Sequence, residues 1–199
     1  MSLDSLLERA DIWRGDRFPA TVGIPTGFAA LDEKLPGSGW PIGALTEILL
    51  PSFGIGELQL IMPALARLSR KKRWIAWIAP PYIPYAPALA ACGVDLSRML
   101  IVRPRATTDG FWAIEQALRS GTCAAVLAWP AGGDRQMWRR LQLAAEAGQS
   151  WGVLFRREQD MEPAPVALRL QLEPLPGGIE VHILKRLGGW AAGPVVLNL

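Results

Sequence analysis

The chain has 199 residues, of which 50% are hydrophobic and 20% charged, and its formal net charge at pH 7 is +3. A chain of this length builds one domain with a full core, and its composition excludes an intrinsically disordered protein. No apolar run approaches the roughly 20 residues that cross a bilayer, and the acidic start at Asp4 does not fit a secretory signal, so we expect a cytoplasmic protein without membrane contact.

Apolar residues at positions 3, 6, 7 and 10 have helical spacing and predict a helix over 3–10. A turn-rich stretch with several prolines and glycines follows, from Pro19 to Pro41. Short apolar runs then alternate with helical segments, two of which have Asp109 and Asp134 as candidate caps. The expected strands are 44–50, 74–79, 100–102, 124–129 and 151–155, and the expected helices are 58–68, 87–92, 109–120 and 134–147.

This alternation predicts βαβ units and a parallel sheet with helices on both faces. After residue 166 the pattern changes to alternating strands at 167–172, 179–185 and 195–197, which predicts antiparallel hairpins at one edge of the sheet. We expect an α/β fold in which residues 1–22 form an N-terminal helix and arm and residues 23–199 form one domain.

The chain has few residues for thiol or imidazole chemistry. Cys92, Cys123 and His182 are its only cysteines and histidine, and they lie far apart without CxxC spacing. Neither a zinc site nor a disulfide framework is expected from this pattern. His182 lies in an alternating apolar and polar run and fits a polar position on a strand. We therefore expect no metal, no cofactor and no histidine-based catalysis.

The connection between the first expected strand and helix contains Gly54 and Gly56, where nucleotide-binding domains cradle phosphate with backbone N–H groups. In that pattern a lysine and a serine or threonine follow the last glycine. Here Glu57 and Leu58 take these two places. A carboxylate repels a triphosphate and leucine cannot hold magnesium, so we expect a degenerate phosphate loop that binds no ATP.

Segments 23–32, 35–48 and 92–100 resemble the sequence around the ATP loop of RecA recombinases, with Thr-Gly, Leu-Asp, Pro-x-Gly and Glu-Ile at like intervals. This resemblance implies a RecA-like three-layer domain with a mostly parallel central sheet, antiparallel C-terminal hairpin strands and an N-terminal helical arm. The acid that ends the Walker B strand of RecA is replaced here by Trp129. The glutamate that orients the attacking water in RecA corresponds to the segment Ala79-Pro80-Pro81, which contains no acid. Phosphoryl transfer depends on such groups, so the chain is not expected to be an enzyme.

Shorter motifs resemble the ImuA family, which is RecA-like and SulA-like and belongs to bacterial mutagenesis cassettes. These motifs lie at 13–15, 35–41, 54–58, 63–66 and 77–81, and the turn at 78–81 is shared with the cell-division inhibitor SulA. The resemblance implies a non-catalytic adaptor in SOS-induced, error-prone translesion DNA synthesis, associated with the nucleoid when engaged. Its implied partners are ImuB, RecA and an error-prone replicative-type DNA polymerase. The alternative is a SulA-like SOS inhibitor of cell division that binds FtsZ.

Arginines and tryptophans supply candidate contacts to single-stranded DNA or to a partner. Trp138 beside Arg139 and Arg140 either stacks a base and holds a phosphate, or packs its helix on the sheet. Trp13 with Arg14 is either a partner-facing anchor or a cover for the domain's own apolar edge. The candidate contacts are Trp13, Arg14, Phe53, Arg135, Trp138, Arg139, Arg140, Arg156 and Arg157. Trp74, Trp77, Trp129 and Trp151 are expected in the core, and Trp40 at a turn.

Overall fold

A computed structural model describes residues 23–160, 165–187 and 192–199. The expected N-terminal helix over 3–10, the arm over 1–22 and the candidate contacts Trp13 and Arg14 lie outside these residues. No helix in the described part of the chain is long and apolar enough to cross a membrane.

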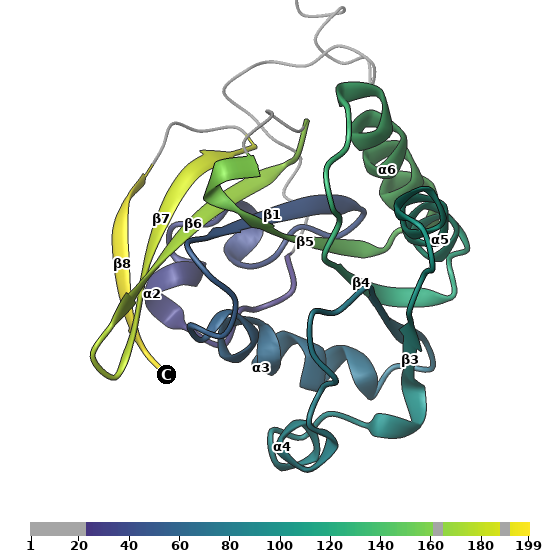
Figure 1. The fold of residues 1–199 in the computed structure, drawn as a ribbon. Helices are drawn as coiled ribbons and strands as arrows, with labels where there is room; N and C mark the ends of the chain where they lie inside the picture. Colours follow the sequence, from purple (N-terminus) through teal and green to yellow (C-terminus); the bar gives the residue numbers. More distant parts are fainter. Residues whose placement is uncertain (1–22, 161–164, 188–191) are drawn as a thin grey trace, which may run out of the picture.

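The described residues form one eight-stranded sheet in the order β3-β2-β4-β5-β1-β6-β7-β8 (Figure 1). Neighbouring strands from β3 to β6 in this order are parallel, whereas β7 is antiparallel to both β6 and β8. This arrangement confirms a mixed α/β fold with a large sheet and antiparallel strands at its C-terminal edge. The strands are β1 (Ala44–Leu50), β2 (Trp74–Ile78), β3 (Met99–Val102), β4 (Cys123–Ala128), β5 (Trp151–Arg157), β6 (Leu168–Leu175), β7 (Gly178–Arg186) and β8 (Ala192–Asn198).

Helices cover both faces of the sheet (Figure 1). On one face, α3 (Glu57–Ser69) and α4 (Ala86–Ala91) pack over one hydrophobic core, next to the short α2 (Ala29–Asp32). On the other face, α5 (Thr107–Arg119) and α6 (Arg135–Gly148) pack over a second core. The described chain also has 3₁₀ turns at Pro36–Ser38, Leu96–Arg98 and Glu158–Asp160.

One of the two expected helix caps is confirmed and the other is wrong. Asp134 caps α6, because its Oδ1 accepts a hydrogen bond from the Met137 backbone N–H at 2.8 Å. Asp109 does not cap α5, which begins two residues earlier and has Ala106 at the capping position. Asp109 lies in the first turn instead, where its charge favours the positive end of the helix dipole.

Tryptophans in the strands build much of the first core. Trp77 stacks on Trp129, and Trp151 stacks on Trp40, with ring centroids 5.7 and 5.2 Å apart. All four side chains are buried, so Trp40 belongs to the core and not to an exposed turn. The expectation that Trp74 lies in the core is wrong: it is 39% exposed. Trp74 is the first residue of β2 and pairs with Cys123 at the end of the sheet.

A buried acid links the middle strands of the sheet. Glu47 of β1 is 0% exposed, and its carboxylate accepts hydrogen bonds from Arg156 of β5, at 2.5 Å, and from Arg169 of β6. Arg156 is 3% exposed, and its guanidinium also lies over the ring of Trp138 on α6 at 4.8 Å. Arg156 is therefore a structural residue, which corrects the expectation that it contacts DNA or a partner.

Replacing Glu47 by glutamine is expected to destabilise the protein by about 3–5 kcal/mol, since Arg156 loses its anionic partner inside the core. Urea unfolding followed by circular dichroism measures the change. The matched control is Glu146→Gln on the exposed side of α6, which is expected to change stability by less than about 0.5 kcal/mol. An equal, small effect of both substitutions would contradict the ion-pair network.

The two thiols are expected to react at different rates. Cys123 is buried at the start of β4, and burial raises the pKa of its thiol, whereas Cys92 is exposed. Because the thiolate is the reactive form, a thiol-reactive disulfide reagent is expected to label Cys92 first and Cys123 only slowly. Cys92→Ser should remove the fast phase, and both thiols should react fast in urea. Rapid labelling of the native Cys92→Ser protein would contradict the burial of Cys123 at the start of β4.

Candidate functional site

The loop after β1 retains the backbone shape of a phosphate cradle. It leads directly into α3, and Gly54 and Gly56 both have positive φ, at 94° and 112°. Gly56 is the residue before the helix, and a side chain there would collide with Leu199, since an added Cβ would lie 2.6 Å from its Cδ1. The positive φ favours glycine at this position, and a larger residue would also require the Leu199 side chain to move.

Glu57 occupies the cradle with its own side chain. Its Oε1 accepts a hydrogen bond from the Gly54 N–H at 2.8 Å, and its Oε2 accepts one from the Ile55 N–H at 2.9 Å. Glu57 is only 5% exposed, and Leu58 packs partly buried against the first core. The backbone donors that would meet a phosphate are already bonded to a carboxylate of this chain.

Two candidate contacts come together beside this loop. Phe53 is half-buried against the first core, and the guanidinium of Arg157 lies 5.4 Å from the centre of its ring. The contact follows from the sheet, because Leu50 at the end of β1 pairs with Arg157 at the end of β5. Arg157 is exposed, so this pair is available at the surface beside the loop.

The other described candidates lie on α6. Arg135, Arg139 and Arg140 are exposed, and Arg140 is ion-paired with Glu115 of α5. Trp138 is 0% exposed and contacts Phe111 edge to face, with ring centroids 5.2 Å apart. Of the two interpretations of Trp138, the structure therefore supports packing of the helix on the sheet and excludes base stacking.

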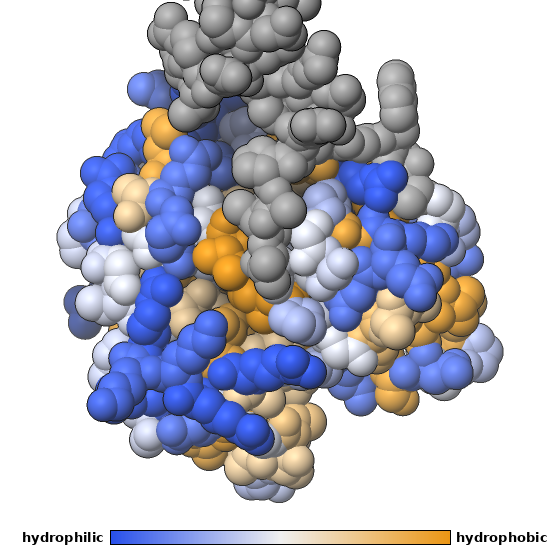
Figure 2. Space-filling model, turned by 180° about the vertical axis from the view of Figure 1, so that it is seen from behind, coloured by the Kyte–Doolittle hydropathy of each residue, from blue (hydrophilic) through white to orange (hydrophobic). Residues whose placement is uncertain are grey.

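Exposed apolar side chains form a feature that the sequence analysis missed. Tyr82, Ile83 and Tyr85 follow β2 and are each more than 70% exposed, and Trp112 on α5 is 64% exposed. Trp112 falls outside the stripe of Phe111, Ile114 and Leu118 that α5 buries, a signal that helical periodicity contains. From behind, the surface shows hydrophobic patches interrupted by hydrophilic ones, with strongly hydrophilic residues gathered at the lower left of the view (Figure 2).

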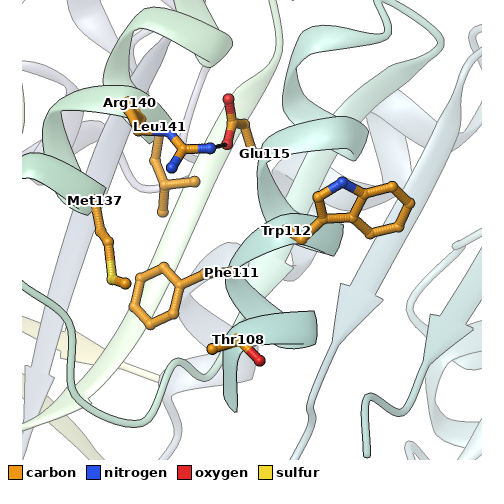
Figure 3. A pocket seen from close by; sticks show the side chains of 7 residues that line it. All are labelled: Thr108, Phe111, Trp112, Glu115, Met137, Arg140 and Leu141. Atoms are coloured by element: carbon orange, nitrogen blue, oxygen red, sulfur yellow. Dashed lines mark hydrogen bonds and ion pairs between the residues drawn. The ribbon is translucent and has the colours of Figure 1, made fainter. Parts of the chain in front are cut away.

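A cavity of about 280 Å³ lies between α5 and α6 (Figure 3). Phe111 and Met137 face each other across it, and Glu115 and Arg140 meet beside it. A second cavity, of about 220 Å³, adjoins the ends of β2 and β4 near Ala79.

His182 lies on β7 as a polar strand residue, as expected. Within the described ranges it belongs to the one group with metal-ligand geometry, in which ligand atoms of Glu173, Glu180 and His182 lie within 4.8 Å of one another. The imidazole Nε2 is 3.2 Å from Glu180 and 3.6 Å from Glu173. The absence of a bound metal stays a prediction.

Comparison with known proteins identifies the family. The family model "Cell division inhibitor SulA" matches residues 43–152, which is more than half of the chain. A cell division inhibitor SulA from Edwardsiella piscicida is 36% identical over 103 residues, covering 51% of this chain and 61% of that protein. A protein ImuA from Caulobacter vibrioides is 30% identical over 151 residues, covering 72% of this chain and 60% of that protein.

Both alignments span about three fifths of the relative's own length. The crystal structure of SulA from Pseudomonas aeruginosa has a TM-score of 0.47 and 28% sequence identity, covering 56% of this chain and 97% of that chain. The match over residues 43–152 runs from the start of β1, through the Glu57 loop and α6, to β5. The chain belongs to the SulA family.

Proposed function

We propose that the chain is a non-catalytic protein of the SOS response to DNA damage. In this proposal the protein inhibits cell division by binding FtsZ and blocking its polymerisation. The match of the SulA family model over residues 43–152 carries this proposal. The relative from Edwardsiella piscicida, whose name describes a cell division inhibitor, supports it. The proposed mode of action is stoichiometric binding to a protein partner.

The phosphate loop supports a role without catalysis. Glu57 satisfies the N–H groups of Gly54 and Ile55, so an ATP phosphate would have to displace a bonded carboxylate and then face its negative charge. Trp129, at the end of β4, is buried and stacked between Trp77 and Phe155. No acid stands there to hold a magnesium ion, and phosphoryl transfer needs that ion in place.

The strand arrangement supports a RecA-like origin for this body. A parallel sheet with helices on both faces and an antiparallel C-terminal edge agrees with the architecture that the RecA resemblance implies. We propose residues 23–199 as one RecA-like domain, preceded by an arm over 1–22 that supplies Trp13 and Arg14 for partner contact.

The second candidate is an ImuA-type adaptor in translesion synthesis, with ImuB, RecA and an error-prone replicative-type polymerase as partners. One observation favours it. Among alignments that cover about 70% of this chain, the one with protein ImuA has 30% identity, whereas the one with the cell division inhibitor SulA of Yersinia pseudotuberculosis has 26%. Contact with single-stranded DNA belongs to this candidate, with Arg135, Arg139 and Arg157 as exposed candidate residues.

Light scattering of FtsZ assembly in the presence of GTP tests the first candidate. We expect the protein to suppress polymerisation at concentrations close to that of FtsZ, because it acts by binding and not by turnover. An unrelated protein of similar mass and pI serves as the control for a non-specific charge effect. If FtsZ assembles normally and this chain forms a complex with ImuB in analytical ultracentrifugation, the ImuA-type adaptor becomes the better supported function.

Replacing Glu57 by alanine tests the occupied phosphate loop. The N–H groups of Gly54 and Ile55 lose their charged acceptor, so we expect a loss of about 1–3 kcal/mol in the free energy of unfolding. Sulfate is expected to restore part of this stability in the variant and to bring the wild type no specific gain. Glu33→Ala, at an exposed glutamate, is the control.

Calorimetric titration with Mg-ATP completes this test. We expect no binding to the wild-type protein at millimolar nucleotide. Tight, magnesium-dependent binding of ATP would overturn the view that Glu57 closes the loop.

A further inference from the structure

The groove between α5 and α6 is open to solvent at one end of the helix pair. At the other end the two helices touch closely, since a Cβ added to Gly148 of α6 would lie 1.9 Å from the Leu118 carbonyl oxygen of α5. Toward their first turns the helices are separated by side chains, with Phe111 against Trp138. The cavity of about 280 Å³ opens in this separated part (Figure 3).

The lining of the groove suits an apolar anchor. Phe111 and Leu141 are 8% and 1% exposed and form its floor, and half-buried Met137 faces Phe111 from α6 (Figure 3). Its volume lies just below the 300–1,000 Å³ that is typical of small-molecule sites. A methionine in the wall also adapts easily to different occupants. The cavity therefore fits one large side chain of a protein partner.

Trp112 adds an exposed aromatic surface at the edge of this groove. Its indole stands on the opposite side of α5 from Met137, where it is 64% exposed (Figure 3). It lies outside the buried stripe of α5, so folding gains little from its apolar area. Tryptophan and arginine are the residues most enriched among those that dominate binding energy in protein interfaces.

Two arginines give the groove a positive rim. The carboxylate of Glu115, which is 6% exposed, accepts hydrogen bonds from Arg119 of α5, at 2.7 Å, and from Arg140 of α6. The side chains of Arg119 and Arg140 are still 54% and 58% exposed. Glu115 therefore fixes two guanidinium groups whose outer N–H donors face solvent, and the three residues together keep one positive charge. Arg139 on α6 is a further exposed cation.

We propose that the groove between α5 and α6 binds an acidic, amphipathic helical segment of a partner protein. One large apolar side chain of this segment enters the cavity, its carboxylates pair with Arg119 and Arg140, and Trp112 packs against its flank. A trough between two helices accepts a helix by the apolar positions of one face. The proposal rests on the proposed function only in assuming a protein partner.

Nucleic acid fits this surface less well. Binding of single strands uses a row of aromatic rings along a basic groove, and among the residues that line this cavity only Trp112 offers an exposed ring, since Phe111 is buried in the floor. The cavity itself is lined mainly by apolar groups.

Selection from a displayed library of random peptides, each of about 16 residues, tests the proposal without a known partner. The wild-type protein is the target, and Trp112→Ala protein removes peptides that bind elsewhere. We expect enriched peptides to be rich in Asp and Glu, with apolar residues at i, i+3 or i+4, and i+7. No enrichment, or enrichment of basic peptides, would overturn the proposal.

Fluorescence anisotropy with one enriched peptide then measures the contribution of single residues. Trp112→Ala is expected to weaken binding about 10-fold or more, which is about 1.4 kcal/mol, and Arg140→Gln about 5-fold, with a loss of salt dependence. Tyr82→Ala, at another exposed aromatic residue, and Arg70→Gln, at the end of α3, are matched controls expected to stay within about twofold. Equal effects in variants and controls would contradict the assignment.

Two further measurements separate other occupants from the proposed one. A single-stranded oligonucleotide that competes with the peptide more strongly than an acidic peptide does would assign the groove to nucleic acid. Self-association of the wild type that Trp112→Ala abolishes, seen by analytical ultracentrifugation, would assign it to a second copy. Either result overturns the proposal.

FtsZ assembly measured with the same variants keeps this inference distinct from the proposed function. Peptide binding without FtsZ inhibition would remove the proposed function and leave the groove. If the wild-type protein inhibits FtsZ assembly but enriches no acidic peptide, the proposed function stands and the groove proposal is overturned.

Discussion

The carboxylate of Glu47 at the centre of the sheet is the interaction on which the rest of the structure depends. A buried charge is tolerated only where a partner compensates its lost hydration, and Glu47 has two, Arg156 on β5 and Arg169 on β6. These contacts join the parallel strands to the C-terminal hairpin. Through the contact of Arg156 with Trp138 they also reach α6. Glu47 thus contacts side chains of β5 and β6 directly and, through Arg156, connects to α6, which forms one wall of the groove between α5 and α6.

A second glutamate applies the same principle at the loop after β1. Glu57 supplies the negative charge that a phosphate would otherwise bring, so the backbone cradle is complete without a ligand. The loop that binds phosphate in nucleotide-binding domains is held here by hydrogen bonds to the Glu57 carboxylate. What remains for function is the outer surface, where Trp112, Arg119 and Arg140 are exposed although a buried acid holds both arginines in place.

Local patterns predicted most elements to within one or two residues, because apolar runs and helical spacing reflect the burial of neighbouring positions. Errors arose where burial depends on distant contacts. The sequence around Trp138 fits both DNA contact and the core, and its contact with Phe111 on α5 places it in the core. Trp40 looked like a turn residue and lies under Trp151, more than a hundred positions away. Trp74 follows the apolar pattern of β2 but stands at the exposed beginning of that strand.

The amino-acid sequence alone determined the chemistry of the phosphate loop. Glu57 and Leu58 stand where a nucleotide-binding loop has a lysine and a serine or threonine. It also determined the alternation of strands and helices, which is a property of neighbouring residues. Only the tertiary structure decided that Arg156 is internal and that Glu57 turns back onto its own loop. It also decided that α5 and α6 leave an apolar groove with Arg140 at its rim. Arg156 is held by Glu47, 109 positions away, and Arg140 of α6 pairs with Glu115 of α5, 25 positions away, so no local periodicity encodes these contacts. The Glu57 contact is local, but it depends on the backbone conformation of the loop and not on a repeating pattern.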